Sequence, residues 1–267
     1  MVAVAVGAVT VAAVTGLAMR SPRDPRTGGD AEGALEPLED KRARIRLPLE
    51  GFEPAIAGVP LGATEPRPIV LVVHDAGDQP EPTCERFANI TAGHPFVLCP
   101  ALAAIGMPVE PPPGPVARPD PAPATTRVEA ELRGALEALK YRFGRYVAPG
   151  SVVLVGIGAG VPAVLEIMQQ DPSFFSRVLL VGTDQQQWSS TRAATFATRG
   201  GKRVLFACLD PECQKHAARN VLFTERAGAQ ARYLDPIPGS SRFDARTAEA
   251  LKKNLPWLTE GDPRFRR

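Results

Sequence analysis

The chain lacks any marked excess of charge of one sign. Its 31 Lys and Arg residues nearly balance 29 Asp and Glu residues, which leaves a formal net charge of +2. No run of Lys and Arg is longer than two residues. Nucleic-acid binding is therefore not expected, because it requires a basic patch or stripe.

The chain also lacks a nucleotide-binding fingerprint and a visible internal repeat. No G-x-G-x-x-G follows the first strongly apolar segment, residues 69–73, and Gly156-x-Gly158-x-Gly160 has no further glycine at the right spacing. A Rossmann site is thus weakly supported, and we expect no cofactor. The length of 267 residues fits one large α/β domain or two small ones.

The N-terminal segment has no charge at all between Val2 and Met19. Eighteen apolar or small residues reach the lower limit for a membrane span. They also fit a secretory signal with a small-x-small cleavage site at Gly16-Leu17-Ala18. We interpret residues 1–19 as a signal peptide or membrane anchor forming an apolar helix, with a buried helix as the alternative. An uncleaved segment would place the protein in a membrane.

Two further features agree with an extracytoplasmic location. Residues 20–40 are rich in Pro, Gly and charged side chains, so we expect a flexible linker before a domain spanning 41–267. Four cysteines allow three pairings if all are bridged, and local pairing of Cys84 with Cys99 and of Cys208 with Cys213 is the simplest. Disulfides require an oxidising compartment. A zinc site is the competing interpretation, but the spacing provides no two short knuckles.

Short apolar segments alternate with helical patterns along the rest of the chain. This order predicts a mostly parallel sheet with helices on both faces. Pro256 is expected to end the last helix, and Thr126-x-x-Glu129 is expected to cap the longest one. The predicted strands are 44–47, 69–73, 96–99, 152–155, 177–181, 203–207 and 231–234, and the predicted helices are 126–143, 161–168, 191–198, 211–227 and 244–255.

A glycine-rich turn follows the strand predicted at 152–155. Gly156-Ile157-Gly158-Ala159-Gly160 has the spacing of the G-x-S-x-G nucleophile elbow, with glycine in place of serine. Glycine adopts the positive φ of such a turn without strain. It has no side-chain atom that could attack a substrate.

Over residues 42–258 the order of elements resembles the α/β-hydrolase superfamily. The Gly156–Gly160 turn resembles its elbow, and His74-Asp75-Ala76-Gly77 resembles the stretch that helps to form the oxyanion hole. The loop Pro238 to Phe243 resembles the loop that carries the catalytic histidine. The resemblance implies a pocket lined by His74, Asp75, Ala76, Gly77, Gly158 and Ala159.

Each functional position of that family is altered here. Gly158 replaces the nucleophile, Ser240 stands where the histidine would be, and no histidine follows His216. Asp75 replaces a usual glycine and would repel a developing oxyanion if it pointed into the pocket. Asp210 occupies the family's acid position, but Asp210-Pro211 is also the pattern of a helix N-cap.

The other candidate side chains have simpler structural interpretations. We expect His74 to be a structural hydrogen-bonding group, His94 and His216 to lie at the surface, and no metal to bind His74, Asp75 and Asp78. Trp188 and Trp257 are expected in the core or at its rim.

Two functional hypotheses follow from these substitutions. The first is a non-catalytic α/β-hydrolase homologue of the cell envelope that binds a small molecule or a protein through the former active-site pocket. The second is an active serine-type esterase that uses a displaced nucleophile, with Ser189, Ser190, Ser240 and Ser241 as candidates. A serine without an adjacent base is a weak nucleophile, which favours the first hypothesis.

Overall fold

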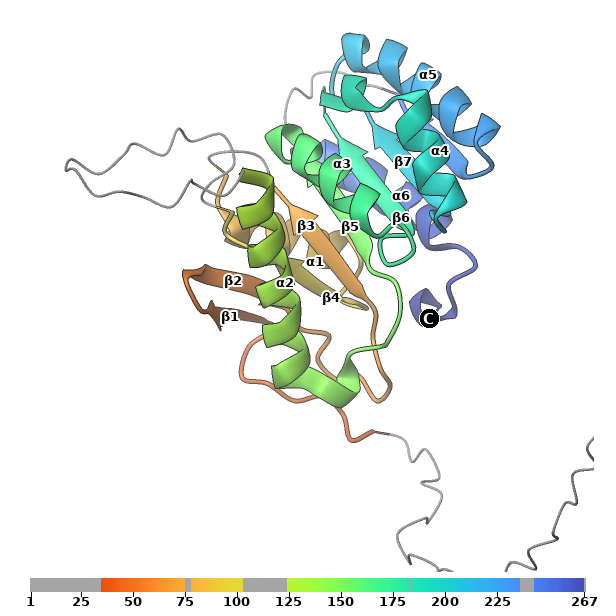
Figure 1. The fold of residues 1–267 in the computed structure, drawn as a ribbon. Helices are drawn as coiled ribbons and strands as arrows, with labels where there is room; N and C mark the ends of the chain where they lie inside the picture. The colour runs from red at the N-terminus through yellow and green to blue at the C-terminus, as the bar shows by residue number, and fades with distance from the viewer. Residues whose placement is uncertain (1–34, 75–77, 103–123, 183, 236–242, 267) are drawn as a thin grey trace, which may run out of the picture. The chain divides into compact units, whose positions relative to one another are not determined.

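The computed structural model describes residues 35–74, 78–102, 124–182, 184–235 and 243–266 (Figure 1). The predicted signal peptide or anchor, Asp75 to Gly77 and Ser240 lie outside these ranges. Among the described residues, no helix is both long enough and apolar enough to span a membrane.

One eight-stranded sheet organises the described domain, with the strand order β1-β2-β4-β3-β5-β6-β7-β8. β1 and β2 pair antiparallel, β2 pairs antiparallel with β4, and all other pairs are parallel. The predicted mostly parallel sheet is therefore confirmed. The strands are β1 (Arg44–Leu49), β2 (Phe52–Gly58), β3 (Ile69–Val73), β4 (Phe96–Cys99), β5 (Val153–Ile157), β6 (Arg177–Val181), β7 (Arg203–Ala207) and β8 (Gln230–Leu234).

Helices cover both faces of this sheet, as Figure 1 shows. Alternate residues of each strand point to opposite faces, so every central strand contributes to two cores. Leu71 and Val73 of β3 join the core under α2 to α5, whereas Val70 and Val72 join the core under α1 and α6. The helices are α1 (Pro80–Ile90), α2 (Ala124–Phe143), α3 (Val161–Gln170), α4 (Ser190–Thr198), α5 (Pro211–Arg226) and α6 (Ala245–Thr259).

Two predicted helix ends are wrong. α2 begins at Ala124, two residues before the predicted start, so Thr126 lies inside the first turn and not at the N-cap position. α6 continues through Pro256 to Thr259, because its last turn buries Leu258 completely against the sheet. Packing of that turn outweighs the helical hydrogen bond that proline cannot donate.

The end of the predicted linker packs on the domain. Leu38 is only 5% exposed, its N–H donates to Ala63 O at 2.9 Å, and its carbonyl accepts from the Gly62 N–H at 2.8 Å. Residues 35–40 therefore contribute to the core beside the loop that follows β2.

Leu38→Ala should lower the free energy of unfolding by about 2–5 kcal/mol, because it removes a buried side chain and leaves a cavity. Leu61→Ala is the matched control in the same region, since Leu61 is 46% exposed. The control should change stability by less than about 0.5 kcal/mol. Urea unfolding measures both, and equal effects would show that residues 35–40 do not support the domain.

Candidate functional site

The carboxyl ends of the parallel strands meet at one edge of the sheet, where ligands bind in open α/β sheets. β5 passes into α3 through a single 3-10 turn, Gly158–Gly160. Gly158 has φ = +50°, a conformation that side chains rarely adopt. The predicted tight turn between strand and helix is therefore confirmed, and its apex carries no side chain.

Close packing requires glycine at position 160 and leaves little room for a side chain at position 156. A Cβ at Gly160 would lie 2.6 Å from Val73 O and 2.8 Å from His74 O. A Cβ at Gly156 would lie 3.1 Å from Val161 Cα. The turn is consequently pressed against the end of β3 and the start of α3, which leaves it little freedom to move.

The neighbouring strand also meets the turn through its backbone. Gly182, directly after β6, has φ = +113°, and a Cβ there would lie 3.4 Å from both N and Cα of Gly158. Gly158 therefore lies between the ends of β3 and β6. On the β6 side, the backbone at Gly182 is close to the backbone of Gly158.

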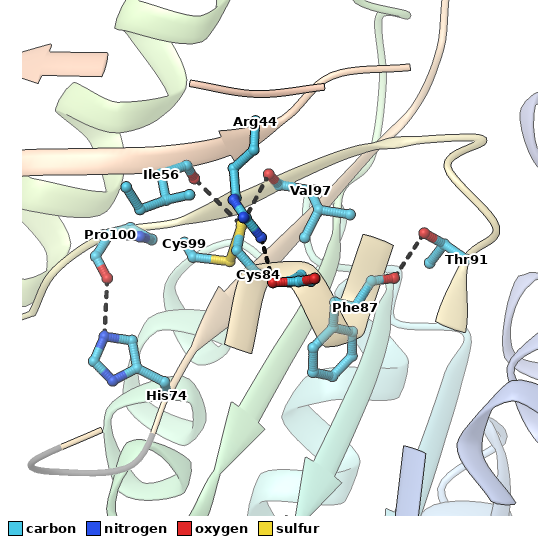
Figure 2. Close-up of a disulfide and its surroundings, with 10 residues drawn as sticks. Arg44, Ile56, His74, Cys84, Phe87, Thr91, Val97, Cys99 and Pro100 are labelled. Carbon is cyan, nitrogen blue, oxygen red and sulfur yellow. Dashed lines mark hydrogen bonds and ion pairs between the residues drawn. A yellow bond between two sulfur atoms is a disulfide. The ribbon is translucent and has the colours of Figure 1, made fainter. Parts of the chain in front are cut away.

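His74 follows β3 and is only 3% exposed. Its Nε2 lies 3.1 Å from Pro100 O, as Figure 2 shows. This bond holds the loop after β4 to the end of β3, which agrees with the expected structural role. The remainder of the predicted oxyanion stretch, Asp75 to Gly77, lies outside the described residues, whereas Ala159 is half-buried in the turn.

Asp210 is a helix cap. Its carboxylate accepts the Cys213 N–H at 2.9 Å, and Pro211 occupies the first turn of α5. The Cys208–Cys213 disulfide closes over this cap, and Cys213 Sγ lies 3.1 Å from Gly182 O. The loop at Asp210 therefore lies beside the Gly182 backbone, which is itself close to Gly158.

Both predicted disulfides are present. The Cys84–Cys99 bridge joins α1 to β4, with Cα atoms 5.8 Å apart (Figure 2). All four cysteines are bridged, so the zinc interpretation is excluded for them. Within the described part of the chain, no group of His, Cys, Asp and Glu side chains has the arrangement of a metal site.

The structure describes two of the four serines proposed as displaced nucleophiles. Ser189 caps α4 and accepts the Arg192 N–H at 3.2 Å, and Ser190 is the exposed first residue of that helix. Ser240 and Ser241 lie outside the described residues.

Sequence reasoning missed a buried carboxylate near this edge. Glu131 of α2 is 3% exposed and accepts the Leu102 N–H at 2.8 Å. Leu102 has φ = +48°, so this bond stabilises a strained backbone after β4. Burial raises the pKa of Glu131, although bonds from the Leu102 and Ala101 N–H groups oppose that shift. The sequence could have indicated this burial, because Glu131 lies on the same apolar face of the helix as Val128 and Ala135.

No family model matches the sequence. No curated protein matches it either. Solved structures do resemble the fold. The Thermus thermophilus protein TT1662 is 14% identical with a TM-score of 0.55, over 81% of this chain and 98% of that one. A thermostable esterase is 16% identical with a TM-score of 0.54, over 82% of this chain and 63% of that one.

A Klebsiella pneumoniae protein assigned as a dienelactone hydrolase is 17% identical with a TM-score of 0.52, over 81% of this chain and 98% of that one. Each of these three neighbours matches the described domain with a TM-score above 0.5. The chain has the α/β-hydrolase fold. At these identities the likeness concerns the fold alone.

Gly160→Ala should destabilise this α/β-hydrolase-fold domain by several kcal/mol, because the new Cβ would overlap the Val73 and His74 carbonyl oxygens. Gly134→Ala is the matched control, since a Cβ at that position of α2 meets nothing within 4 Å. The control should raise stability by up to about 1 kcal/mol through helix propensity. Thermal unfolding of both variants measures the difference, and tolerance of Gly160→Ala would contradict the close packing of the turn.

Glu131→Gln should raise the free energy of unfolding near pH 7 and change it little near pH 4. The folded pKa of Glu131 lies above the ordinary value of 4.5. Folded protein therefore keeps this proton after the unfolded chain has lost it, and stability falls as pH rises through that window. Glutamine keeps an acceptor for the Leu102 N–H and does not ionise.

Glu137→Gln is the control for this comparison, because Glu137 lies exposed on the same helix. The unfolding free energy of Glu137→Gln should differ from that of wild type by the same small amount near pH 4 and near pH 7. A wild-type advantage over Glu131→Gln near pH 7 would show instead that the ionised carboxylate stabilises the fold.

Proposed function

We propose that this protein is a non-catalytic member of the α/β-hydrolase fold that binds a small molecule or a protein at the carboxyl edge of its sheet. The observation that carries the proposal is Gly158 at the apex of the turn after β5, where φ is +50°. The turn has the local geometry for presenting a nucleophile, and the residue that it presents has no side chain.

The absence of a base in the sequence supports the same conclusion. No histidine follows His216, so the loop at 238–243 has no imidazole. His74 is the histidine beside the turn, and its Nε2 bonds to Pro100 O. Asp210 is engaged as a helix cap by the Cys213 N–H. Removing any triad member lowers the rate by orders of magnitude, and losing two members leaves little of this chemistry.

The two disulfides favour an oxidising compartment, and we propose that the protein acts outside the cytoplasm. The predicted signal or anchor at residues 1–19 agrees with this location. The proposed binding surface comprises His74, Asp75, Ala76, Gly77, Gly158 and Ala159.

Turnover of short-chain p-nitrophenyl esters tests the loss of catalysis. Wild type and Gly158→Ser should match a heat-denatured control, because a serine at 158 has no base to accept its proton. Gly158→Ser with Ser240→His is the smallest change that restores both groups, and it alone should gain activity. Gly158→Ala with Ser240→His is its matched control, since it adds the imidazole without the hydroxyl.

Steady turnover by the wild-type protein would overturn the proposal and favour an active esterase with a displaced nucleophile. Labelling with a fluorophosphonate would then locate that nucleophile. Ser189→Ala, which removes the cap of α4, distinguishes a described candidate from the serines at 240 and 241.

A further inference from the structure

A cavity lies at the edge of the sheet opposite Gly158, where the parallel strands begin. Its volume is about 830 Å³, within the range of small-molecule sites. The loop before β4, the end of α6 and residues 260–266 enclose it, together with Arg232 of β8. The apolar lining consists of Ile90, Pro95, Leu255, Pro256, Trp257 and Phe265.

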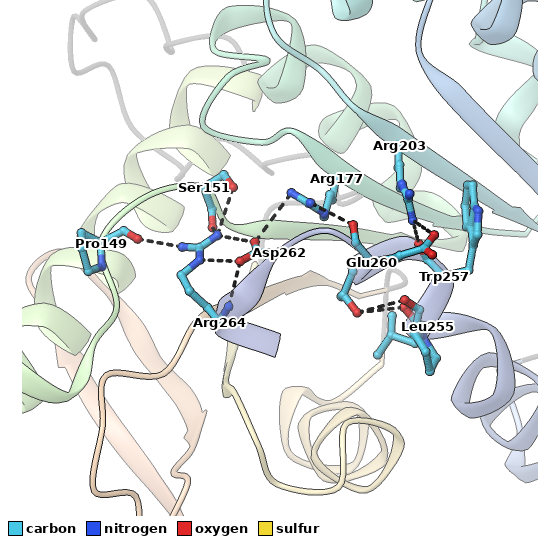
Figure 3. Close-up of polar contacts among 11 residues, drawn as sticks. Pro149, Ser151, Arg177, Arg203, Leu255, Trp257, Glu260, Asp262 and Arg264 are labelled. Atoms are coloured by element: carbon cyan, nitrogen blue, oxygen red, sulfur yellow. Dashed lines mark hydrogen bonds and ion pairs between the residues drawn. The ribbon is translucent and has the colours of Figure 1, made fainter. Parts of the chain in front are cut away.

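The carboxylates that line this cavity are already paired. Glu260 accepts from Arg203 at 2.8 Å, and Asp262 accepts from Arg264 at 2.6 Å and faces Arg177 at 3.6 Å (Figure 3). Arg177 and Asp262 are themselves buried. Both carboxylates on the lining are therefore engaged by arginines outside the group Arg232, Lys252 and Arg266.

Three cationic side chains line the same cavity without a carboxylate partner among the described residues. These are Arg232, Lys252 and Arg266, which come from β8, α6 and the segment after α6. Positive charge from three elements on the lining of one cavity favours an anionic ligand.

The segment after α6, which carries Arg266, is held in place by hydrogen bonds. Arg264 donates to Pro149 O and to Ser151 O, each at 2.8 Å, and so ties the segment after α6 to the chain before β5 (Figure 3). Arg177 donates to Glu260 O at 3.2 Å. A preformed wall lowers the ordering cost of binding.

Trp257 fixes the position of one cation. The Arg232 guanidinium carbon lies 4.7 Å from the centroid of the indole, and that of Arg203 lies 5.3 Å from it. Both distances suit a cation–π contact. The indole thus holds Arg232 at the cavity wall while forming part of the apolar lining.

We propose that this cavity binds an organic anion, with an apolar body against Trp257 and Leu255 and a compact anionic head on Arg232 and Lys252. The cavity lies at the edge opposite Gly158, so this site is separate from the former active-site edge. It does not depend on whether that edge has lost its chemistry.

Octanoate is the probe for the test, and tryptophan fluorescence is the readout. The chain has two tryptophans, and Trp188 is 1% exposed in the core on the other face of the sheet. Octanoate should change the emission of Trp257 in the full-length protein, and Trp257→Phe should abolish that change. Octanamide and inorganic phosphate should each bind at least about tenfold more weakly than octanoate. Octanamide has the apolar chain but no charge, and phosphate has the charge but no apolar chain.

Lys252→Gln and Arg232→Gln should each raise the Kd for octanoate by about tenfold. Lys253→Gln is the matched control, because Lys253 is adjacent on α6, lies outside this cavity and pairs with Glu249. Circular dichroism checks that each variant is folded. Equal binding of octanoate and octanamide, an unchanged Kd in Lys252→Gln, or no fluorescence change would overturn the proposal.

Discussion

The contact on which the candidate site depends is the approach of the Gly158–Gly160 turn to the end of β3. Gly160 lies so close to the carbonyl oxygens of Val73 and His74 that a methyl group would overlap them. On the other side the end of β6 lies within van der Waals contact, since a Cβ at Gly182 would be 3.4 Å from Gly158 N and Cα. Backbone packing between three parallel strands therefore holds the turn. The turn keeps its conformation although its apex is a glycine, because the close packing at the flanking glycines holds the backbone in place.

The two edges of the sheet carry different chemistry. At the carboxyl edge, two carboxylates have structural roles: Asp210 caps α5, and Glu131 holds the strained loop at Leu102. At the opposite edge, paired carboxylates leave Arg232 and Lys252 facing an apolar cavity. Since α6 supplies Lys252, Leu255 and Trp257, its continuation past Pro256 is what shapes that cavity.

Most of the central sheet could be predicted because its strands are apolar throughout. The segments 69–73, 96–99, 177–181 and 203–207 match the observed strands. β2 was missed, because Phe52–Gly58 contains proline and is exposed at its start. The cavity lined by Arg232 and Lys252 was not predictable either, since it combines a loop, a strand, a helix and the segment after it, and no local pattern relates them.

The sequence by itself indicated the class of fold, the glycine turn and the cap at Asp210, and it favoured the local pairing of the cysteines. Each of these rests on residues close together in the chain, where apolar runs, spacing and side-chain hydrogen bonding act locally. Tertiary structure alone decided that Glu131 is buried against Leu102, that Pro256 stays inside α6 and that Leu38 joins the core. Those outcomes depend on contacts between distant segments, whose packing outweighs local preference.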